Sequence, residues 1–250
     1  MKSNNFSLSI IVNGKPIHEY YHNGNYFVEG RKDSEFVIEF VNDTYRRVLV
    51  VPSIDGLSPV DGTIATSDSM GFIVEPFSTL TIPGWAIDEN NVANFKFMDK
   101  EKSYASVMRS SKEAQAGVIG ILVYGEDTVA LQVSQTRRNQ KDIQSLYPNK
   151  TILWPVDKIS GYPKDIWNAT ASTSTSSFDY GVGWGSEQKF SVETEMFNRG
   201  QILEQMVIYY DSRRNLEKRG IQIVKKDTTY LNDLPSPFRG IGCPRPNFSS

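Results

Sequence analysis

Cysteine and histidine are both scarce in this chain of 250 residues. The single cysteine, Cys243, excludes an internal disulfide and a zinc site built from several thiolates. The two histidines, His18 and His22, offer few bases for catalysis, and neither is followed by a Gly-x-Ser-x-Gly motif. We therefore expect a protein without catalytic residues, metal ions or cofactors.

Long apolar runs and blocks of like charge are also missing. No stretch approaches the roughly 20 apolar residues of a membrane-spanning helix, and the polar start of the chain lacks the features of a signal peptide. The 27 basic and 29 acidic residues give a formal net charge of -2. We therefore expect synthesis in a cytoplasm, no membrane span and no direct binding to nucleic acid.

Alternating apolar residues dominate the first half of the chain. Phe6, Leu8 and Ile10 alternate with serines, which is the period-2 pattern of a half-buried strand, and Asn13-Gly14 predicts a tight turn after it. Residues 35–41 and 47–52 predict two strands spaced as a hairpin. Further apolar stretches cover residues 71–74, 80–82, 92–98 and 118–124. About eight short strands with regular turns are typical of a sandwich or jelly roll.

Three further parts follow the predicted sandwich of residues 1–126. Residues 127–177 contain three prolines and a run of Ala, Ser and Thr, and predict a linker or extended arm. Residues 178–226 predict a small β-β-α-β unit. Residues 227–250 contain four prolines and predict an extended tail. The predicted fold class is mainly β: a jelly-roll-like β-sandwich with a smaller C-terminal unit and extended arms.

The small unit over 178–226 is predicted in some detail. A glycine- and aromatic-rich loop should cover 178–185, before strands over 189–194 and 203–210. Asp211 or Ser212 can cap a short helix that Gly220 ends, and a strand over 221–224 should follow.

Two groups of residues could bind a metal ion. His18 and His22 should share one face of a strand, and Glu35 could lie on a neighbouring strand, which suggests a cupin-like metal enzyme. The His-x-His pair and the glycine-framed spacing of cupins are missing, so we favour surface histidines. Three loop aspartates could bind calcium, but they lack EF-hand spacing, and Asp-Gly pairs commonly form turns; these are Asp55, Asp61 and Asp68.

The four tryptophans stand beside Gly, Pro or Asn, in contexts typical of loops. Trp85 and Trp184 could stack on the apolar face of a sugar. Other large or reactive side chains in the arm and the tail are candidates for contacts between subunits, where loop tryptophans often become buried. These are Trp154, Trp167, Phe238 and Cys243.

Residues 48–56, with Val60-Asp61-Gly62 and Ile82-Pro83-Gly84-Trp85, resemble a family of small β proteins of bacteria, phages and large DNA viruses. The resemblance covers roughly residues 26–125, extends to residues 210–213 and includes no catalytic motif. More broadly, the short strands, the scarce cysteine and the proline-rich tail are similar to those of single jelly-roll capsid and penton proteins of icosahedral double-stranded DNA viruses.

The resemblance to capsid proteins implies a virion protein that is made and assembled in the host cytoplasm. It would act as a penton (vertex) or minor capsid protein, with copies of itself, pentameric at a vertex, and neighbouring capsid proteins as partners. A jelly roll forms a rigid wedge with few exposed edges, and extended arms bury surface only on assembly. The alternative is a non-enzymatic β-sandwich that binds carbohydrate or a receptor, and the third interpretation is the cupin-like enzyme.

Overall fold

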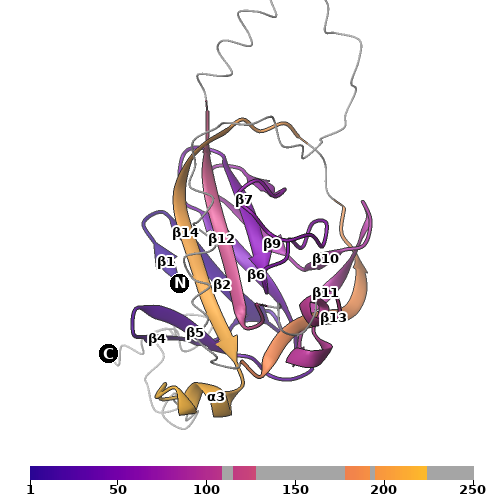
Figure 1. The fold of residues 1–250 in the computed structure, drawn as a ribbon. Coiled ribbons are helices and arrows are strands. Elements are labelled where there is room, and N and C mark those ends of the chain that lie inside the picture. Colours follow the sequence, from indigo (N-terminus) through magenta and orange to yellow (C-terminus); the bar gives the residue numbers. More distant parts are fainter. Residues whose placement is uncertain (109–114, 128–177, 192–194, 224–250) are drawn as a thin grey trace, which may run out of the picture.

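The computed structural model describes residues 1–108, 115–127, 178–191 and 195–223. These residues form two multi-stranded β-sheets with a few short helices (Figure 1). The prediction of a mainly β, sandwich-like protein is thus confirmed, whereas the jelly-roll connectivity stays a prediction. Within the described ranges, no helix is long and apolar enough to cross a membrane.

The first sheet has eight strands. Five of them follow one another in the order β1 (Lys2–Ser3), β2 (Phe6–Val12), β6 (Glu35–Asn42), β11 (Asn91–Asp99) and β10 (Gly84–Ala86). Three more pair with members of this row: β3 (Lys15–Pro16) with β2, β9 (Ser78–Ile82) with β6, and β13 (Tyr180–Lys189) with β11.

The second sheet has six strands, in the order β4 (Glu19–His22), β5 (Asn25–Glu29), β14 (Arg199–Asp211), β12 (Val118–Glu126), β7 (Val48–Ile54) and β8 (Phe72–Val74). The strand β14 is antiparallel to β12 and parallel to β5. The helical elements are η1 (Lys100–Lys102), α1 (Tyr104–Met108) and α3 (Arg213–Lys218).

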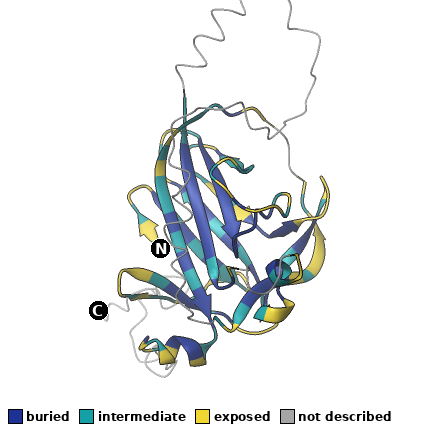
Figure 2. Ribbon diagram, in the orientation of Figure 1, coloured by how far each residue is buried: buried dark blue, intermediate teal, exposed yellow. Residues whose placement is uncertain are grey.

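Apolar side chains from both sheets form one large core. In β2 and β6 every second residue is buried, as the alternating pattern predicts, whereas all of β7 is buried (Figure 2). Both faces of β7 are covered, because Leu49 and Val51 belong to a second cluster with Phe197 on its outer face. The largest fully buried side chains include Trp85, Tyr210, Phe36, Phe40, Phe95 and Phe97.

The strands predicted at 35–41 and 47–52 are present, but their prediction as a hairpin is wrong. The strand β6 pairs with β2, β9 and β11 in the first sheet, and β7 pairs with β8 and β12 in the second. Residues 43–47 therefore cross between the sheets. An alternating pattern shows which face of a strand is buried, but it does not identify the neighbouring strand.

The structure also differs from the predicted separate unit over 178–226, because β13 and β14 belong to the two sheets of the sandwich. The predicted loop over 178–185 forms most of β13 instead. A Cβ atom at Gly181 would collide with Ser103, and one at Gly183 would collide with Met98. The glycines therefore permit close packing of a strand, which the sequence alone did not distinguish from a loop.

The helix predicted after Asp211 is confirmed as α3. Ser212 is its N-cap, and Gly220 follows it with a φ of 83°. The strand predicted over 221–224 is absent from residues 221–223. Residues 128–177 of the predicted arm and the predicted tail over 227–250 lie outside the described residues.

Candidate functional site

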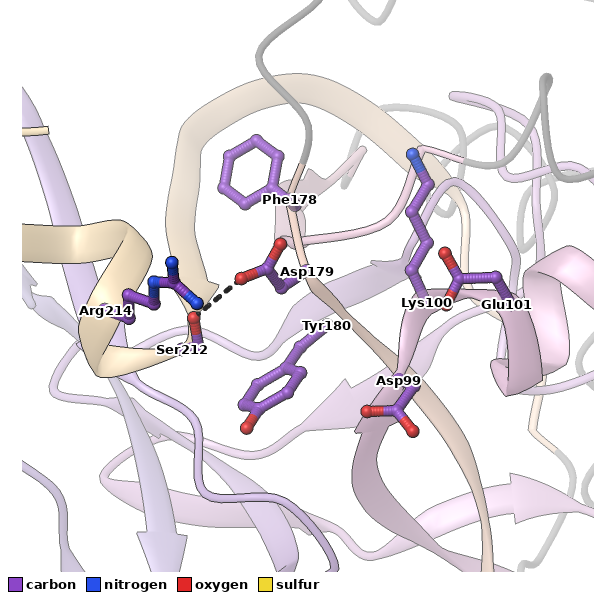
Figure 3. Close-up of a pocket in the computed structure, with 8 residues that line it drawn as sticks. All are labelled: Asp99, Lys100, Glu101, Phe178, Asp179, Tyr180, Ser212 and Arg214. Carbon is purple, nitrogen blue, oxygen red and sulfur yellow. Dashed lines mark hydrogen bonds between the residues drawn. The ribbon is translucent and has the colours of Figure 1, made fainter. Parts of the chain in front are cut away.

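A groove with a volume of about 610 Å³ lies at the end of the sandwich where α3 begins. Its walls come from three segments that are far apart in the sequence: Asp99–Glu101, Phe178–Tyr180, and the start of α3 with Ser212 and Arg214. Figure 3 shows the α3 residues facing the η1 residues, with Asp179 and Tyr180 between them. We call this site the groove.

The groove combines aromatic rings with charges of both signs. Phe178 and Tyr180 are half-buried and contribute apolar surface. Glu101 is an exposed carboxylate of η1, whereas Asp99 forms an ion pair with Lys32 at 2.6 Å. Rings beside carboxylates and cations can bind a protein side chain or a sugar, because the rings stack while the polar groups form hydrogen bonds.

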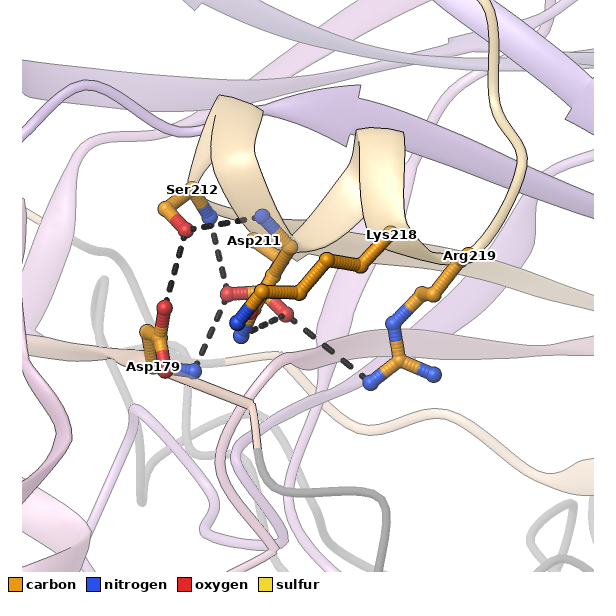
Figure 4. Close-up of polar contacts among 6 residues, drawn as sticks. Asp179, Asp211, Ser212, Lys218 and Arg219 are labelled. Carbon is orange, nitrogen blue, oxygen red and sulfur yellow. Dashed lines mark hydrogen bonds and ion pairs between the residues drawn. The ribbon is translucent and has the colours of Figure 1, made fainter.

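A buried carboxylate fixes the wall of the groove nearest α3 (Figure 4). Asp211 Oδ1 accepts the backbone N–H groups of Asp179 at 3.0 Å and Ser212 at 2.8 Å, and Oδ2 accepts Asn215 Nδ2 at 3.2 Å. The Ser212 hydroxyl donates to Asp179 Oδ2 at 3.1 Å. Burial raises the pKa of Asp211, although the hydrogen bonds favour its charged form.

Arg219, the C-cap residue of α3, supports the same wall. Its guanidinium lies 3.8 Å from Asp211 Oδ2 and 4.3 Å from the centroid of the Phe178 ring. Arginine over an aromatic face is a favourable cation–π contact. Phe178 and Asp179 are therefore anchored to α3 by contacts that do not use the open side of the groove.

A second surface lies at the opposite end of the strands, where two loops carry exposed aromatic side chains. Tyr45 is 73% exposed in the loop between β6 and β7, and Phe77 is 72% exposed in the turn between β8 and β9. The Phe77 N–H donates to the Thr44 carbonyl at 3.2 Å, so the two loops touch. We call Tyr45, Arg46 and Phe77 the tip.

One buried amide holds both loops of the tip. Asn42, which is fully buried, donates from Nδ2 to the carbonyls of Arg46 at 2.9 Å, Val74 at 3.2 Å and Glu75 at 3.0 Å. Its Oδ1 accepts the Thr44 N–H at 3.0 Å and the Thr44 hydroxyl at 2.7 Å. These five contacts, in which three carbonyls share the two amide hydrogens, join the two loops of the tip.

Phe77 occupies a backbone conformation that suits glycine or asparagine. Its φ is 53°, and it follows Pro76 in a turn. Proline followed by a residue with positive φ is the arrangement of a type II turn. With a positive φ, an L-residue whose side chain does not hydrogen-bond to the local backbone destabilises the folded protein by about 1 kcal/mol. The turn thus places a large apolar ring in solvent at the expense of backbone strain.

The two arginines next to Tyr45 have different environments. The Arg46 guanidinium lies 5.2 Å from the centroid of the Tyr45 ring and is exposed. Arg47 is bonded through Nε to Glu126 at 2.6 Å and through Nη1 to Glu195 at 2.6 Å, and these carboxylates raise its pKa. Arg46 is therefore the cation that the tip presents.

Asp55 is a fully buried acid in the core between the two sheets. Its Oδ1 accepts the Tyr210 hydroxyl at 2.6 Å and the Gly117 N–H at 3.0 Å, and its Oδ2 accepts the Val182 N–H at 2.7 Å. Burial raises the pKa of Asp55 to about 6 and the pKa of Tyr210 well above its usual value. The carboxylate links β13 of one sheet to β14 of the other.

The sequence assigns the two candidate stacking residues to loops, and the structure corrects this for both, because Trp85 lies on β10 and Trp184 on β13. Trp85 is 1% exposed, and its indole Nε1 donates to the Gly183 carbonyl at 3.2 Å, so no face of its ring is open to a sugar. Trp184 is 41% exposed and lies on β13 against Tyr104. Its stacking role stays a prediction. The candidate interface residues Trp154, Trp167, Phe238 and Cys243 lie outside the described residues.

The candidate metal site of His18, His22 and Glu35 is not assembled. The histidines stand before and at the end of β4 in the second sheet, whereas Glu35 begins β6 in the first. Glu35 instead accepts Asn94 Nδ2 at 2.9 Å and the Ser186 N–H at 2.6 Å, and these bonds lower its pKa. Among the described residues, no three His, Cys, Asp or Glu side chains gather as metal ligands would.

The candidate calcium aspartates are also separated. Asp55 turns into the core, whereas Asp61 and Asp68 are exposed. Asp61 Oδ1 accepts the N–H and the hydroxyl of Thr63 at 3.0 Å and 2.9 Å, which is a local turn. The prediction of a turn at Asp55-Gly56 is confirmed by φ values of 53° and 81°.

Sequence reasoning missed both the tip and the groove. Asn42 is typical of a turn, and nothing in its neighbourhood signals five hydrogen bonds from a buried side chain. The groove is formed by three segments that meet only in the fold. The proline before Phe77 was the one local signal of a turn, but it does not show that the aromatic ring faces solvent.

Comparisons with known proteins give no relative: no family model, no curated protein and no solved structure matches the chain.

Proposed function

We propose that this chain is a structural subunit that acts by binding copies of itself, as a penton or minor protein of a viral capsid. The observation that supports this proposal is the tip, where Asn42 holds Tyr45 and Phe77 in solvent. Tyrosine, phenylalanine and arginine are enriched at protein interfaces, and tyrosine and arginine are enriched among the residues that dominate binding. The virion setting follows from the resemblance of the sequence to jelly-roll capsid proteins.

The exposure and the backbone conformation of Phe77 are the main support for self-association. Its ring is exposed and its φ is 53°, so it buries little surface in the isolated subunit while its backbone is strained. Asparagine would fit this turn with less strain. Strained residues that the surrounding structure holds in place commonly serve a function. A contact with another subunit would bury the ring and compensate for the strain.

Electron microscopy of the purified chain tests the proposal. We expect negatively stained samples to contain rings or shells of uniform size, because a subunit that binds its own copies assembles as its concentration rises. Single subunits at the highest soluble concentration would argue against a structural role through self-association.

A second function, carbohydrate binding, is favoured by the groove. Phe178 and Tyr180 can stack on a sugar, and Asp179, Glu101 and Arg214 can bond its hydroxyl groups. A glycan array tests this function. A sugar that binds the wild type and the Trp184→Ala variant, but not the Tyr180→Ala variant, would place binding in the groove. Loss on Trp184→Ala alone would place it at the exposed ring of Trp184, outside the groove.

A further inference from the structure

We propose that the tip of one copy docks in the groove of a second copy, so that subunits join head to tail. This inference rests on the proposed function, because it specifies the surfaces through which the subunits meet. The occupant of the groove is thus Phe77, Tyr45 and Arg46 of another identical chain.

The two surfaces lie at opposite ends of the same subunit. Arg47, next to the tip, bonds Glu126 at the end of β12, and Glu126 pairs with Arg199 at the start of β14. The other end of β14 is Asp211, which precedes the groove residue Ser212. The 13 residues of β14 span up to about 40 Å. A subunit therefore cannot place its own tip in its own groove.

The side chains of the two surfaces can pair. The tip carries two exposed rings on tight loops, and the groove has a volume of about 610 Å³, within the roughly 300–1,000 Å³ of sites that hold small ligands. Phe178 and Tyr180 offer rings for stacking. Glu101 offers an exposed carboxylate to Arg46.

A contact between two tips fits the charges less well. It would bring the exposed Arg46 groups of two copies together, and like charges across an interface oppose binding, while the same loops also expose Asp43 and Glu75. Docking into the groove can place Arg46 beside the exposed carboxylate of Glu101, in a lining that also contains Lys100 and Arg214. Each docked pair leaves one tip and one groove unused, and such head-to-tail contacts continue into a closed ring or a filament. A ring agrees with the vertex oligomer proposed above.

A mixing experiment tests this contact. The tip variant carries Arg46→Gln and Phe77→Asn, and the groove variant carries Glu101→Gln and Tyr180→Ala. Native mass spectrometry of the wild type should show oligomers, and each variant alone should be monomeric. An equal mixture should form heterodimers and nothing larger, because one intact tip meets one intact groove. The control is Tyr21→Ser, which removes a ring that is 67% exposed on β4 and should leave the wild-type oligomers unchanged.

Other results would overturn the inference in distinguishable ways. Wild-type oligomers that persist in both variants would reject the docking but leave the proposed function intact. Monomeric variants that do not combine on mixing would reject the pairing of tip with groove. A wild type that stays monomeric would reject the proposed function as well, and its binding of an oligosaccharide in the groove would favour the second function.

Folding of each variant is checked by circular dichroism melting. Phe77→Asn and Arg46→Gln change exposed side chains, so the tip variant should be at least as stable as the wild type at dilutions where both are monomers. If Tyr180→Ala lowers the melting temperature, Glu101→Gln alone replaces it as the groove variant. That single change should weaken the wild-type oligomers at least several-fold, and unchanged oligomers would count against the docking.

Discussion

The two ends of the sandwich are held by different chemistry. At the tip, a neutral amide, Asn42, bonds the backbone of both loops. At the other end, two buried carboxylates accept the hydrogen bonds that hold the structure: Asp55 joins the sheets, and Asp211 anchors the groove wall. The difference implies that the groove end responds to pH, whereas the geometry of the tip does not.

The largest effect is expected for Asp55→Asn at low pH. Burial raises the pKa of Asp55 from 3.8 to about 6. The folded state therefore favours the protonated form of Asp55, and the stabilisation is full below about pH 4 and is lost as the pH rises through about 6. Asparagine has no such titration, and its amide would face the Val182 N–H, another donor. We expect a loss of about 4 kcal/mol near pH 4 and about 1 kcal/mol near pH 8.

Urea unfolding of the wild type and the Asp55→Asn variant at several pH values measures this difference. Comparing the two proteins cancels the titration of the other carboxyl groups. A difference in the free energy of unfolding that stays constant across this range would show that Asp55 does not titrate as its burial implies.

Asn42→Ala should destabilise the protein by about 3 kcal/mol, because it removes five hydrogen bonds and leaves buried carbonyls without a donor. The loss should be the same near pH 4 and near pH 8. Denaturant unfolding at both pH values checks this. A pH-dependent loss would remove the contrast between the two ends.

Ser212→Ala should cost about 1 kcal/mol, the usual value for loss of an N-cap. The change also removes the hydroxyl that donates to Asp179. Amide hydrogen exchange should speed up in α3 and not in the loops of the tip. Faster exchange at both ends would indicate general destabilisation instead of a local effect on the groove wall.

Phe77→Asn should have the smallest effect, with a change in unfolding free energy between zero and a gain of about 1 kcal/mol. Asparagine accepts the positive φ of Phe77, and the lost ring was exposed. Thermal melting of the monomer checks this prediction. A loss of more than about 1 kcal/mol would mean that the ring packs within its own subunit, and the case for an interface would weaken.

Much of the fold follows from residue patterns alone. The alternation in residues 6–12 and 35–41 predicts β2 and β6, and Ser212 with Gly220 predicts the limits of α3. These features are local, because each depends on neighbours along the chain. The pairing of strands is not local, and so β6 and β7 were assigned to a hairpin although they belong to different sheets.

The candidate surfaces were harder to predict for the same reason. Glycine favours a loop on local grounds, yet Gly181 and Gly183 lie in β13, at positions where Ser103 and Met98 leave no room for a side chain. Trp85 resembles a loop residue but is in the core. Asp55 was predicted in a turn, and it is there, but its burial depends on β12, β13 and β14.

The mass of the chain in solution tests self-association most directly. Sedimentation equilibrium over a dilution series should give a wild-type mass that is a multiple of the 28.2 kDa subunit and falls on dilution, while Phe77→Asn should give a lower multiple at each concentration. A wild-type mass of one subunit at every concentration would contradict the account.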